Sequence, residues 1–326
     1  PMLDDKHRSA VRLFNGFLEG CPNLVVDLYS RTLLLHNYAN PPENASSTIQ
    51  MALDFYLDQL PWIEAVICKM HRSPEKQERQ GLLIRGDKTN REITEHGIRY
   101  AIDLTMNQDA SFYIDTRNLR HWLKNNMRGK TVLNTFAYTG SLGVAAHAGG
   151  ASRVIQTDLS RKFLNLAKTS YTLNGFPIIK GDFITADFFQ TIGRLKSAKT
   201  LFDCVILDPP FFSTTKAGKV DLVREAHRLI NKARPLVNHN GWLITINNAL
   251  FLNGKDYLQT LESLCSDGYL QIEDLLSVPQ DITGSPTTRI RELPVDPSPF
   301  NHSTKIAILR VLRKNHSQPS AKVPHE

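Results

Sequence analysis

Asp208 begins the stretch of this chain with the clearest potential for chemistry. It follows the apolar run 204–207 and precedes two prolines and two phenylalanines. Proline fixes φ and lacks the N–H that a β-ladder needs, so a strand predicted over 203–207 must end here. A carboxylate and two aromatic rings then lie on a rigid loop at the carboxyl end of a strand, where open α/β sheets bind their ligands. Such rings can stack on a flat base, which indicates an enzyme that acts on a nucleobase.

Residues that could contact a ligand also follow the three strands predicted before the strand over 203–207. Gly140 lies in the turn after the strand over 131–135, where glycine lets the backbone approach a ligand. Asp158 ends the second strand and could accept from both hydroxyls of a ribose. Asp182 follows the third and could accept from an adenine amino group, although either acid could instead only cap the next helix. Their placement at successive strand ends, with Asp208 on the fourth, favours a site for an adenosyl cofactor.

These residues resemble the motifs of the class I S-adenosylmethionine-dependent methyltransferases. The resemblance rests on residues 134–140, 158–160, 174–175, 182 and 202–212. The segment 112–117, Phe-Tyr-Ile-Asp-Thr-Arg, together with 12–16 and 25–27, makes the chain similar to bacterial 23S ribosomal RNA methyltransferases that modify cytosine C5 or guanine N7. The resemblance covers nearly the whole chain. It implies a Rossmann-like α/β domain with a mixed, mostly parallel seven-stranded sheet, S-adenosyl-L-methionine as cofactor and large-subunit ribosomal RNA as partner.

The resemblance also implies roles for individual residues. The turn 136–140 should face the methionine part of the cofactor, Asp158 its ribose and Asp182 its adenine. The loop that begins at Asp208 should face the sulfonium and the target base. The predicted cofactor-binding residues are Tyr113, Asp115, Arg117, Phe136, Tyr138, Thr139, Gly140, Asp158, Leu159, Asp182, Phe183 and Asp208. The predicted catalytic residues are Asp208, Pro209, Pro210, Phe211 and Asn247.

The positions of the cysteines bear on which ring atom is methylated. Cytosine C5 is a poor nucleophile, so its methylation needs a cysteine that first adds to the ring, and in relatives of the cytosine type this cysteine follows the fifth strand. Residues 243–249 contain none, and Cys204 is expected to pack in the core. Asn247 and Asn248 instead resemble the guanine-N7 branch. Guanine N7 has an available lone pair, so its methylation needs proximity and in-line geometry more than a general base.

The elements that must position these residues alternate between strand and helix from about residue 106, which predicts a parallel sheet with crossover helices. Strands are predicted over 131–135, 153–157, 178–181, 203–207, 242–246, 271–277 and 306–312. Helices are predicted over 117–127, 142–147, 161–173, 184–195, 222–236 and 257–265. Residues 106–314 are therefore the predicted methyltransferase domain. Within it, 279–303 lacks periodicity and is either a substrate lid or a packed connector.

Residues 1–105 are predicted to form a small α+β domain that could bind RNA. A hairpin is expected over 24–28 and 32–36, followed by a helix over 48–60 and short strands over 63–70, 81–85, 92–95 and 98–104. Residues 315–326 are predicted to be a disordered tail.

Composition limits the remaining classes. The net charge of +7 over 326 residues favours an anionic partner. No stretch approaches the ~20 apolar residues of a membrane span, and the first residues lack a targeting pattern, so a cytoplasmic location is expected. The four cysteines lie far apart, which predicts no metal site. The oligomeric state is left open.

Three alternatives remain open from the sequence. The enzyme could methylate an exocyclic amine or cytosine C5 in ribosomal RNA. The chain could instead be a catalytically inactive RNA module that binds the cofactor. A nicotinamide dehydrogenase is disfavoured, because the G-x-G-x-x-G fingerprint is absent.

Overall fold

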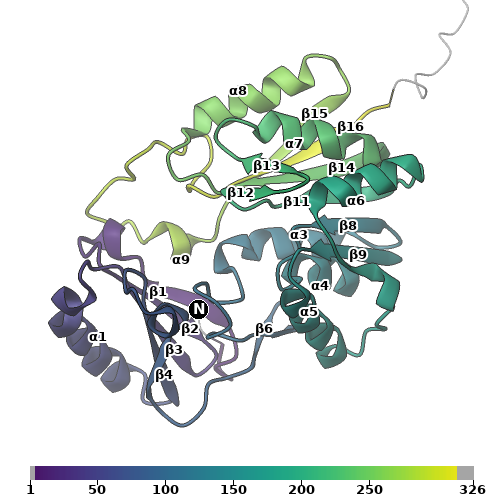
Figure 1. Ribbon diagram of the computed structural model, residues 1–326. Coiled ribbons are helices and arrows are strands. Elements are labelled where there is room, and N and C mark those ends of the chain that lie inside the picture. Colours follow the sequence, from purple (N-terminus) through teal and green to yellow (C-terminus); the bar gives the residue numbers. More distant parts are fainter. Residues whose placement is uncertain (1–3, 314–326) are drawn as a thin grey trace, which may run out of the picture.

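The computed structural model describes residues 4–313, and the tail predicted over 315–326 lies outside them. The larger sheet has seven strands in the order β10-β9-β8-β11-β14-β16-β15 (Figure 1). Strands β10 to β14 in this order run parallel, and β16 is antiparallel to both of its neighbours. The strands are β8 (Thr131–Thr135), β9 (Arg153–Asp158), β10 (Phe183–Thr185), β11 (Phe202–Leu207), β14 (Val237–Asn247), β15 (Leu270–Leu276) and β16 (Lys305–Val311). The predicted mixed, mostly parallel seven-stranded sheet is confirmed.

Helices cover both faces of this sheet because its central strands are apolar on both sides. Val132, Ile206 and Ile244 pack in one core with α3 (Arg117–Asn126), α4 (Ser141–Ala148) and α5 (Arg161–Leu173). Their chain neighbours, Leu133, Val205 and Leu243, pack in a second core on the opposite face. The helices of that face are α6 (Phe188–Ser197), α7 (Ala226–Ala233) and α8 (Gly254–Cys265). The arrangement is doubly wound, as the alternation of elements predicted.

The sequence prediction was wrong around the third strand. The strand expected over 178–181 does not form: residues 178–179 are irregular, Lys180–Asp182 form a 3-10 helix, and β10 begins at Phe183. Ile178 and Ile179 have the β-branched side chains typical of a strand, but they are 45% and 56% exposed. The next helix begins at 188 rather than 184, because the Asp187 side chain caps it by accepting from Phe189 N at 2.8 Å. A hairpin of β12 (Phe212–Thr215) and β13 (Gly218–Asp221) was also missed, and it delays α7 to residue 226.

The first hundred residues form a second sheet and a separate hairpin. The five-stranded sheet has the order β1 (Ala10–Phe14), β2 (Leu24–Tyr29), β3 (Thr32–Asn37), β4 (Ala65–Met70) and β5 (Leu82–Arg85). The predicted hairpin is β2–β3, and β3 runs parallel to β4 across α1 (Ser46–Gln59). Strand β1 was not predicted. The short helix α2 (Lys76–Gln80) precedes β5, and β6 (Glu92–Glu95) pairs with β7 (Ile98–Ala101).

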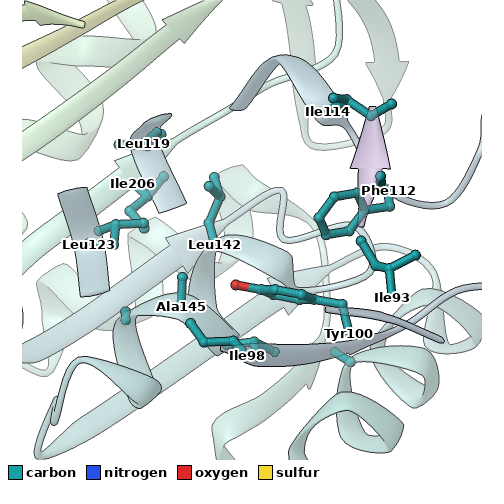
Figure 2. Packing of buried hydrophobic residues seen from close by; sticks show 14 of the residues in the cluster. Ile93, Ile98, Tyr100, Phe112, Ile114, Leu119, Leu123, Leu142, Ala145 and Ile206 are labelled. Carbon is teal, nitrogen blue, oxygen red and sulfur yellow. The ribbon is translucent and has the colours of Figure 1, made fainter. Parts of the chain in front are cut away.

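The two sheets share one continuous core. Helix α1 covers one face of the small sheet. The other face contributes Tyr29, Leu34 and Ile67 to the same cluster as α3 and α4. Figure 2 shows side chains of β6 and β7, among them Ile93 and Tyr100, gathered with Phe112 and with residues of α3 and α4. Apolar burial therefore fixes the small sheet against the seven-stranded sheet.

Residues 279–303 pack on the small sheet. The segment contains α9 (Gln280–Thr283), which lies beside β1 in Figure 1. The Asp281 carboxylate accepts from Arg12 N at 3.1 Å, and Asn15 Nδ2 donates to the Asp281 carbonyl at 2.8 Å. Further along, Ile290 N donates to the Leu18 carbonyl at 2.9 Å. Of the two predicted roles, these contacts favour the packed connector.

Among the described residues, no helix is both long enough and apolar enough to cross a membrane. Within the same 4–313 range, no group of three or more His, Cys, Asp or Glu side chains could hold a metal ion.

Candidate active site

A cavity of about 720 Å³ lies at the carboxyl ends of β8, β9, β11 and β14. Each of these strands delivers at least one lining residue at or just beyond its end. Phe136 and Tyr138 follow β8, Asp158 ends β9, Asp208 follows β11 and Ile246 is the penultimate residue of β14. Parallel strands end at the same edge of the sheet, which is why residues spread over more than a hundred positions converge here.

The turn after β8 is held in a conformation that few side chains adopt. Phe136, Tyr138 and Gly140 have φ of 53°, 51° and 78°. A Cβ atom at Gly140 would lie 2.5 Å from Ala167 Cβ, so the position requires glycine. Left-handed backbone at a residue other than glycine costs about 1–3 kcal/mol, and such strain gathers at functional sites. With the backbone in this conformation, Phe136 and Tyr138 both line the cavity.

Thr139 and Gly140 stabilise this turn through hydrogen bonds, and neither is among the residues that line the cavity. The Thr139 hydroxyl donates to the Ser111 carbonyl at 2.6 Å, and the side chain is 4% exposed. Gly140 N donates to the Ala137 carbonyl at 2.8 Å. Both predicted cofactor residues are therefore placed to hold the turn rather than to touch a ligand with a side chain.

The Asp158 carboxylate contacts this turn and has acceptor positions left for a ligand. It accepts from Tyr138 N at 2.9 Å and from Ser160 N at 2.7 Å. A carboxylate offers about four acceptor positions, so about two remain for a ligand. Burial raises its pKa, although these two hydrogen bonds oppose the shift. Leu159 next to it is 58% exposed and lines the cavity together with Phe163, which gives this end an apolar surface.

Asp208 lines the cavity beyond the end of β11, as predicted, together with Pro209, Pro210 and Phe211. Burial, and then the negative charge of Asp115, raise the pKa of Asp208 to about 7. Pro209 is buried and Pro210 is exposed, while the Phe211 side chain is 47% exposed. The site therefore pairs an acceptor of unusually high proton affinity with an accessible aromatic ring.

Two side-chain oxygen atoms at the cavity are buried without a hydrogen-bond partner among the described residues. They are Asp115 Oδ1 and Asn248 Oδ1. The other Asp115 oxygen accepts from the Thr304 hydroxyl at 2.7 Å. Buried acceptors are almost always satisfied in folded proteins, so both atoms point to a ligand that brings donors or positive charge.

Tyr113 closes the same side of the cavity. Its hydroxyl donates to Asp109 Oδ2 at 3.0 Å, and its ring lies 5.2 Å from the ring of Tyr138. Burial, followed by the charge of Asp109, raises the pKa of Tyr113 well above the usual range. The hydroxyl is therefore a permanent donor rather than an acid.

Asn247 corrects the sequence prediction, because the structure places it outside the cavity. Its Nδ2 donates to the Leu222 carbonyl at 3.1 Å, its Oδ1 accepts from Ala249 N at 3.0 Å, and it is 1% exposed. Side chains alternate along a strand, so Ile246 and Asn248 face the cavity instead. Asn248 is the amide available to a ligand.

Arg117, Asp182 and Phe183 also lie away from the cavity. Arg117 makes two hydrogen bonds to Asp281, at 2.7 and 2.9 Å. Asp182 Oδ1 accepts from Arg153 at 2.7 Å and the residue is 4% exposed. The Phe183 ring packs against Tyr171 at 5.1 Å in the core. These three side chains make contacts within the protein and are not among the residues that line the cavity.

Several lining residues were not predicted from the sequence. Asn107, Asp109 and Thr304 come from loops without a recognisable motif, and only the folded chain brings them to the site. Leu250 and Phe251 are 62% and 75% exposed and also line the cavity. Two adjacent apolar residues after an Asn-Asn pair at a strand end were the one available signal.

The cysteines lie elsewhere. Cys204 is fully buried inside β11, where burial and the charge of Asp203 raise its pKa far above the usual value. Cys265 ends α8, and Cys21 and Cys68 belong to the small sheet and its loops. Within the described part of the chain, no cysteine, histidine or lysine lines the cavity.

Comparison with known proteins gives a consistent result. A family model described as S-adenosylmethionine-dependent methyltransferase matches residues 64–283. The chain is 31% identical over 239 residues to ribosomal RNA large subunit methyltransferase I of Vibrio cholerae, covering 72% of this chain and 60% of that protein. It is 30% identical over 269 residues to ribosomal RNA large subunit methyltransferase K/L of Alteromonas mediterranea, covering 79% of this chain and 37% of that one. The match to each of these relatives thus spans less than two thirds of the relative's length.

Solved structures share the fold. SMU.776, a putative methyltransferase complexed with SAH, superposes with a TM-score of 0.80 at 22% identity, covering 94% of this chain and 76% of that one. A tRNA m1G37 methyltransferase of M. jannaschii gives a TM-score of 0.55 at 15% identity, covering 91% of this chain and 78% of that one. At these identities the likeness concerns the fold alone.

Proposed function

The chain belongs to the S-adenosylmethionine-dependent methyltransferase family, and from that premise we propose that it methylates guanine N7 in large-subunit ribosomal RNA. The observation that carries this proposal is the chemistry of the cavity lining. Acceptors on Asp208 and Asn248 line the same cavity as the Phe211 ring, and the lining residues of the described chain include no cysteine that could add to a pyrimidine.

The cavity fits S-adenosylmethionine, which supplies a methyl group on a positively charged sulfur. Asp158 has free acceptor positions for the two ribose hydroxyls, and Leu159 and Phe163 offer apolar surface to the adenine. Asp115 Oδ1 lacks a partner among residues 4–313, and no basic side chain of that range pairs with Asp208. Two carboxylates that form no ion pair among the described residues match a ligand that carries an ammonium and a sulfonium.

Asp208 would be ionised in the loaded site. Its raised pKa reflects burial beside Asp115, and a positive charge nearby favours the charged form of a carboxyl. In that form it accepts N–H donors of the target base. Pro209 and Pro210 fix the direction of the loop, so that the base is held at one distance from the methyl group.

Guanine presents the donors that these acceptors need. Its N1–H and its exocyclic amine can donate to Asp208 and to Asn248 Oδ1, while the Phe211 ring, 47% exposed, stacks on its face. N7 lies on the opposite edge and needs no deprotonation. The protein's contribution is then proximity and orientation, which together account for several kcal/mol of barrier lowering in well-aligned reactions.

RNA as the substrate is supported by relatives and by charge. The relatives described above are named as large-subunit ribosomal RNA methyltransferases, and the chain carries a net charge of +7. Leu250 and Phe251 expose apolar side chains at the cavity, where they can contact unstacked bases. A cytoplasmic location follows for an enzyme with this substrate.

A second candidate is methylation of an exocyclic amine, favoured by one observation. Asp208 has a pKa of about 7, which suits a group that takes a proton from an amine at neutral pH.

Nucleoside analysis decides between these reactions. Purified protein is incubated with labelled S-adenosylmethionine and a 23S ribosomal RNA transcript, and the digested RNA is examined by mass spectrometry. The expected product is 7-methylguanosine, formed by the wild type and not by Asp208→Asn. N2-Methylguanosine would support the second candidate, whereas 5-methylcytidine would contradict both. Cofactor binding without transfer to any RNA would indicate an inactive module.

A further inference from the structure

A second cavity, of about 190 Å³, adjoins the active site on the side of the small sheet. It is lined by residues of β1, β2 and β3, by the segment after β4 and the loop before α3, and by Ile282 and His302 of the connector region. Asp109, Tyr113 and Asp115 line both cavities. The proposed reaction gives this second cavity no role.

A chain of hydrogen bonds that runs from buried Asp27 to exposed Gln108 forms one wall of the second cavity. Arg12 Nε donates to Asp27 Oδ1 at 2.8 Å, and His36 Nε2 lies 3.2 Å from Asp27 Oδ2. His36 Nδ1 lies 2.9 Å from His71 Nε2, and His71 Nδ1 lies 3.2 Å from the Gln108 amide nitrogen. Burial opposes ionisation of Asp27, but Arg12 and His36 outweigh it and hold the Asp27 pKa below its usual range. The wall is therefore a fixed polar network rather than loosely packed surface.

Tyr38 and His71 form an aromatic pair in the lining of the second cavity, and His71 belongs to the hydrogen-bonded chain. The Tyr38 ring is stacked on the His71 ring with centroids 4.3 Å apart and planes 8° apart. Tyr38 is nevertheless 40% exposed, and Gln108 and Asp109 beside it are exposed as well. Burial, followed by electrostatic effects of His36, Lys69 and Arg72, lowers the pKa of His71 to about 3, so the His71 ring is neutral at physiological pH. A rigid, uncharged aromatic pair that reaches solvent is suited to stack on a flat ring.

The charges of the cavity select the kind of ring. Arg12 is the one lysine or arginine among the lining residues of the described chain, and it is committed to Asp27. Asp109 and Asp115 add two carboxylates to the lining. A phosphate would meet net negative charge. A neutral base with amino or ring N–H donors would meet acceptors instead.

We propose that the second cavity binds another nucleobase of the RNA substrate, splayed out of the strand beside the target nucleotide and stacked on Tyr38. This inference rests on the proposed function, because it requires RNA at the adjoining site. The smaller cavity has about a quarter of the volume of the first, 190 against 720 Å³, which suits a single ring system rather than a cofactor. Tyr38 is thus a specificity-determining contact outside the reacting atoms.

Steady-state kinetics with Tyr38→Ala and Tyr38→Phe test this assignment on the 23S ribosomal RNA transcript. Stacking on an aromatic side chain is strong enough that Tyr38→Ala should raise the KM for RNA on the order of tenfold. Tyr38→Phe keeps the ring and should behave like the wild type. Both variants should retain the wild-type KM for S-adenosylmethionine. Phe55→Ala, which removes a 58% exposed ring from distant α1, is the matched control and should leave both constants unchanged.

Ultraviolet cross-linking of the same transcript to the wild-type protein supplies a readout that does not depend on turnover. Mass spectrometry of the digested complex should find a nucleotide adduct at Tyr38. Methylation of the RNA together with a silent Tyr38→Ala variant and no adduct would overturn this inference and leave the proposed function intact. An equal rise in the cofactor KM would assign the cavity to the cofactor and also overturn it. Absence of both methylation and adduct would remove the proposed function and this inference together.

Discussion

Arg117 and Asp281 are joined by two hydrogen bonds, of 2.7 and 2.9 Å, across 164 residues of chain. Arg117 begins α3 of the methyltransferase domain, and Asp281 lies in α9 of the connector. The same carboxylate accepts from Arg12 N in β1, and the Arg117 guanidinium also donates to the Ala10 carbonyl at 2.7 Å. One ion pair therefore links three segments and fixes the small sheet beside the active site.

Arg117→Met should destabilise the fold without removing cofactor affinity. The substitution leaves the Asp281 carboxylate, 2% exposed in its side chain, without its cation, and breaking a buried pair in this way costs about 3–5 kcal/mol. Urea unfolding measures this loss, and calorimetry on the folded protein measures cofactor affinity. Arg234→Met, which breaks the more exposed pair with Asp267, is the control and should cost less than about 1 kcal/mol. Lost cofactor affinity at unchanged stability would contradict the structural role of Arg117.

Asn247 and Asn248 form a natural pair of matched variants. Asn247→Ala leaves the buried Leu222 carbonyl and Ala249 N without partners, which should reduce the free energy of unfolding by about 1–3 kcal/mol. Asn248→Ala removes an acceptor that has no partner among the described residues, so stability should change little while methyl transfer falls. Thermal unfolding and single-turnover assays on both variants check this. The opposite pattern would restore Asn247 as the catalytic residue.

Asp208→Asn should abolish transfer and yet stabilise the protein at high pH. The pKa of Asp208 rises from 3.8 to about 7 on folding, so between these values the folded state holds a proton that the unfolded state has released. Stability from this group therefore falls as the pH rises through that window. The variant has no carboxyl group to ionise, so it does not lose this stability, and its Tm at pH 8 should exceed that of the wild type by about 1–2 °C per kcal/mol recovered. Calorimetric scans at pH 4 and pH 8 test this, and an equal difference at both pH values would refute the assignment.

Two buried lysines, Lys69 and Lys305, should stabilise two loops beside the cavity, the one with Asn107 and Asp109 and the one with Ala249. Lys305 Nζ donates to the Ala249 carbonyl at 3.0 Å, and Lys69 Nζ donates to the Asn107 and Asp109 carbonyls at 2.8 and 3.1 Å. Both lysines are 0% exposed. Lys69→Met and Lys305→Met keep the side-chain length but leave these carbonyls unsatisfied, at a cost of about 1–3 kcal/mol each. Because Asn107 and Asp109 line the cavity, the KM for the cofactor should rise in Lys69→Met, and urea unfolding together with kinetics would detect both effects.

Phe251→Ala should weaken RNA binding at no cost in stability. The ring is 75% exposed at the mouth of the cavity, so its removal loses little packing, whereas a stacked base is worth about 1–3 kcal/mol. Filter binding of the 23S ribosomal RNA transcript measures the change. Met51→Ala, at a 64% exposed position on α1, should bind as the wild type does. Equal effects of the two substitutions would show that exposed apolar side chains contribute without regard to position.

The sequence predicted those parts of the site that depend on local rules. Asp158 and Asp208 could be placed because an acid or a proline pair at the end of an apolar run marks the edge of a parallel sheet. Asn247 was predicted at the site in place of Asn248, because which of two adjacent residues faces the cavity depends on strand register, and composition does not reveal the register. Asp109 and Thr304 could not be found at all, since each reaches the cavity through a loop whose path is set by tertiary packing.

In the fold, too, elements set by local sequence were predicted and elements set by distant contacts were missed. The β2–β3 hairpin was predicted from two apolar runs around a short turn. Strand β1 and helix α9 were missed because each is short and is stabilised by the other, through contacts such as that of Arg12 N with Asp281. Short elements that depend on distant partners carry little signal of their own.

The position of β16 constrains the order of events during synthesis. This strand lies inside the sheet, between β14 and β15, although it is made after both. Thr304, immediately before it, completes the hydrogen bonding of Asp115, and Lys305 within it supports the turn that carries Asn248. A nascent chain that has emerged only as far as β15 therefore has an open gap in its sheet and an unfinished catalytic pocket. Strand β16 must therefore leave the ribosome before the cavity is complete.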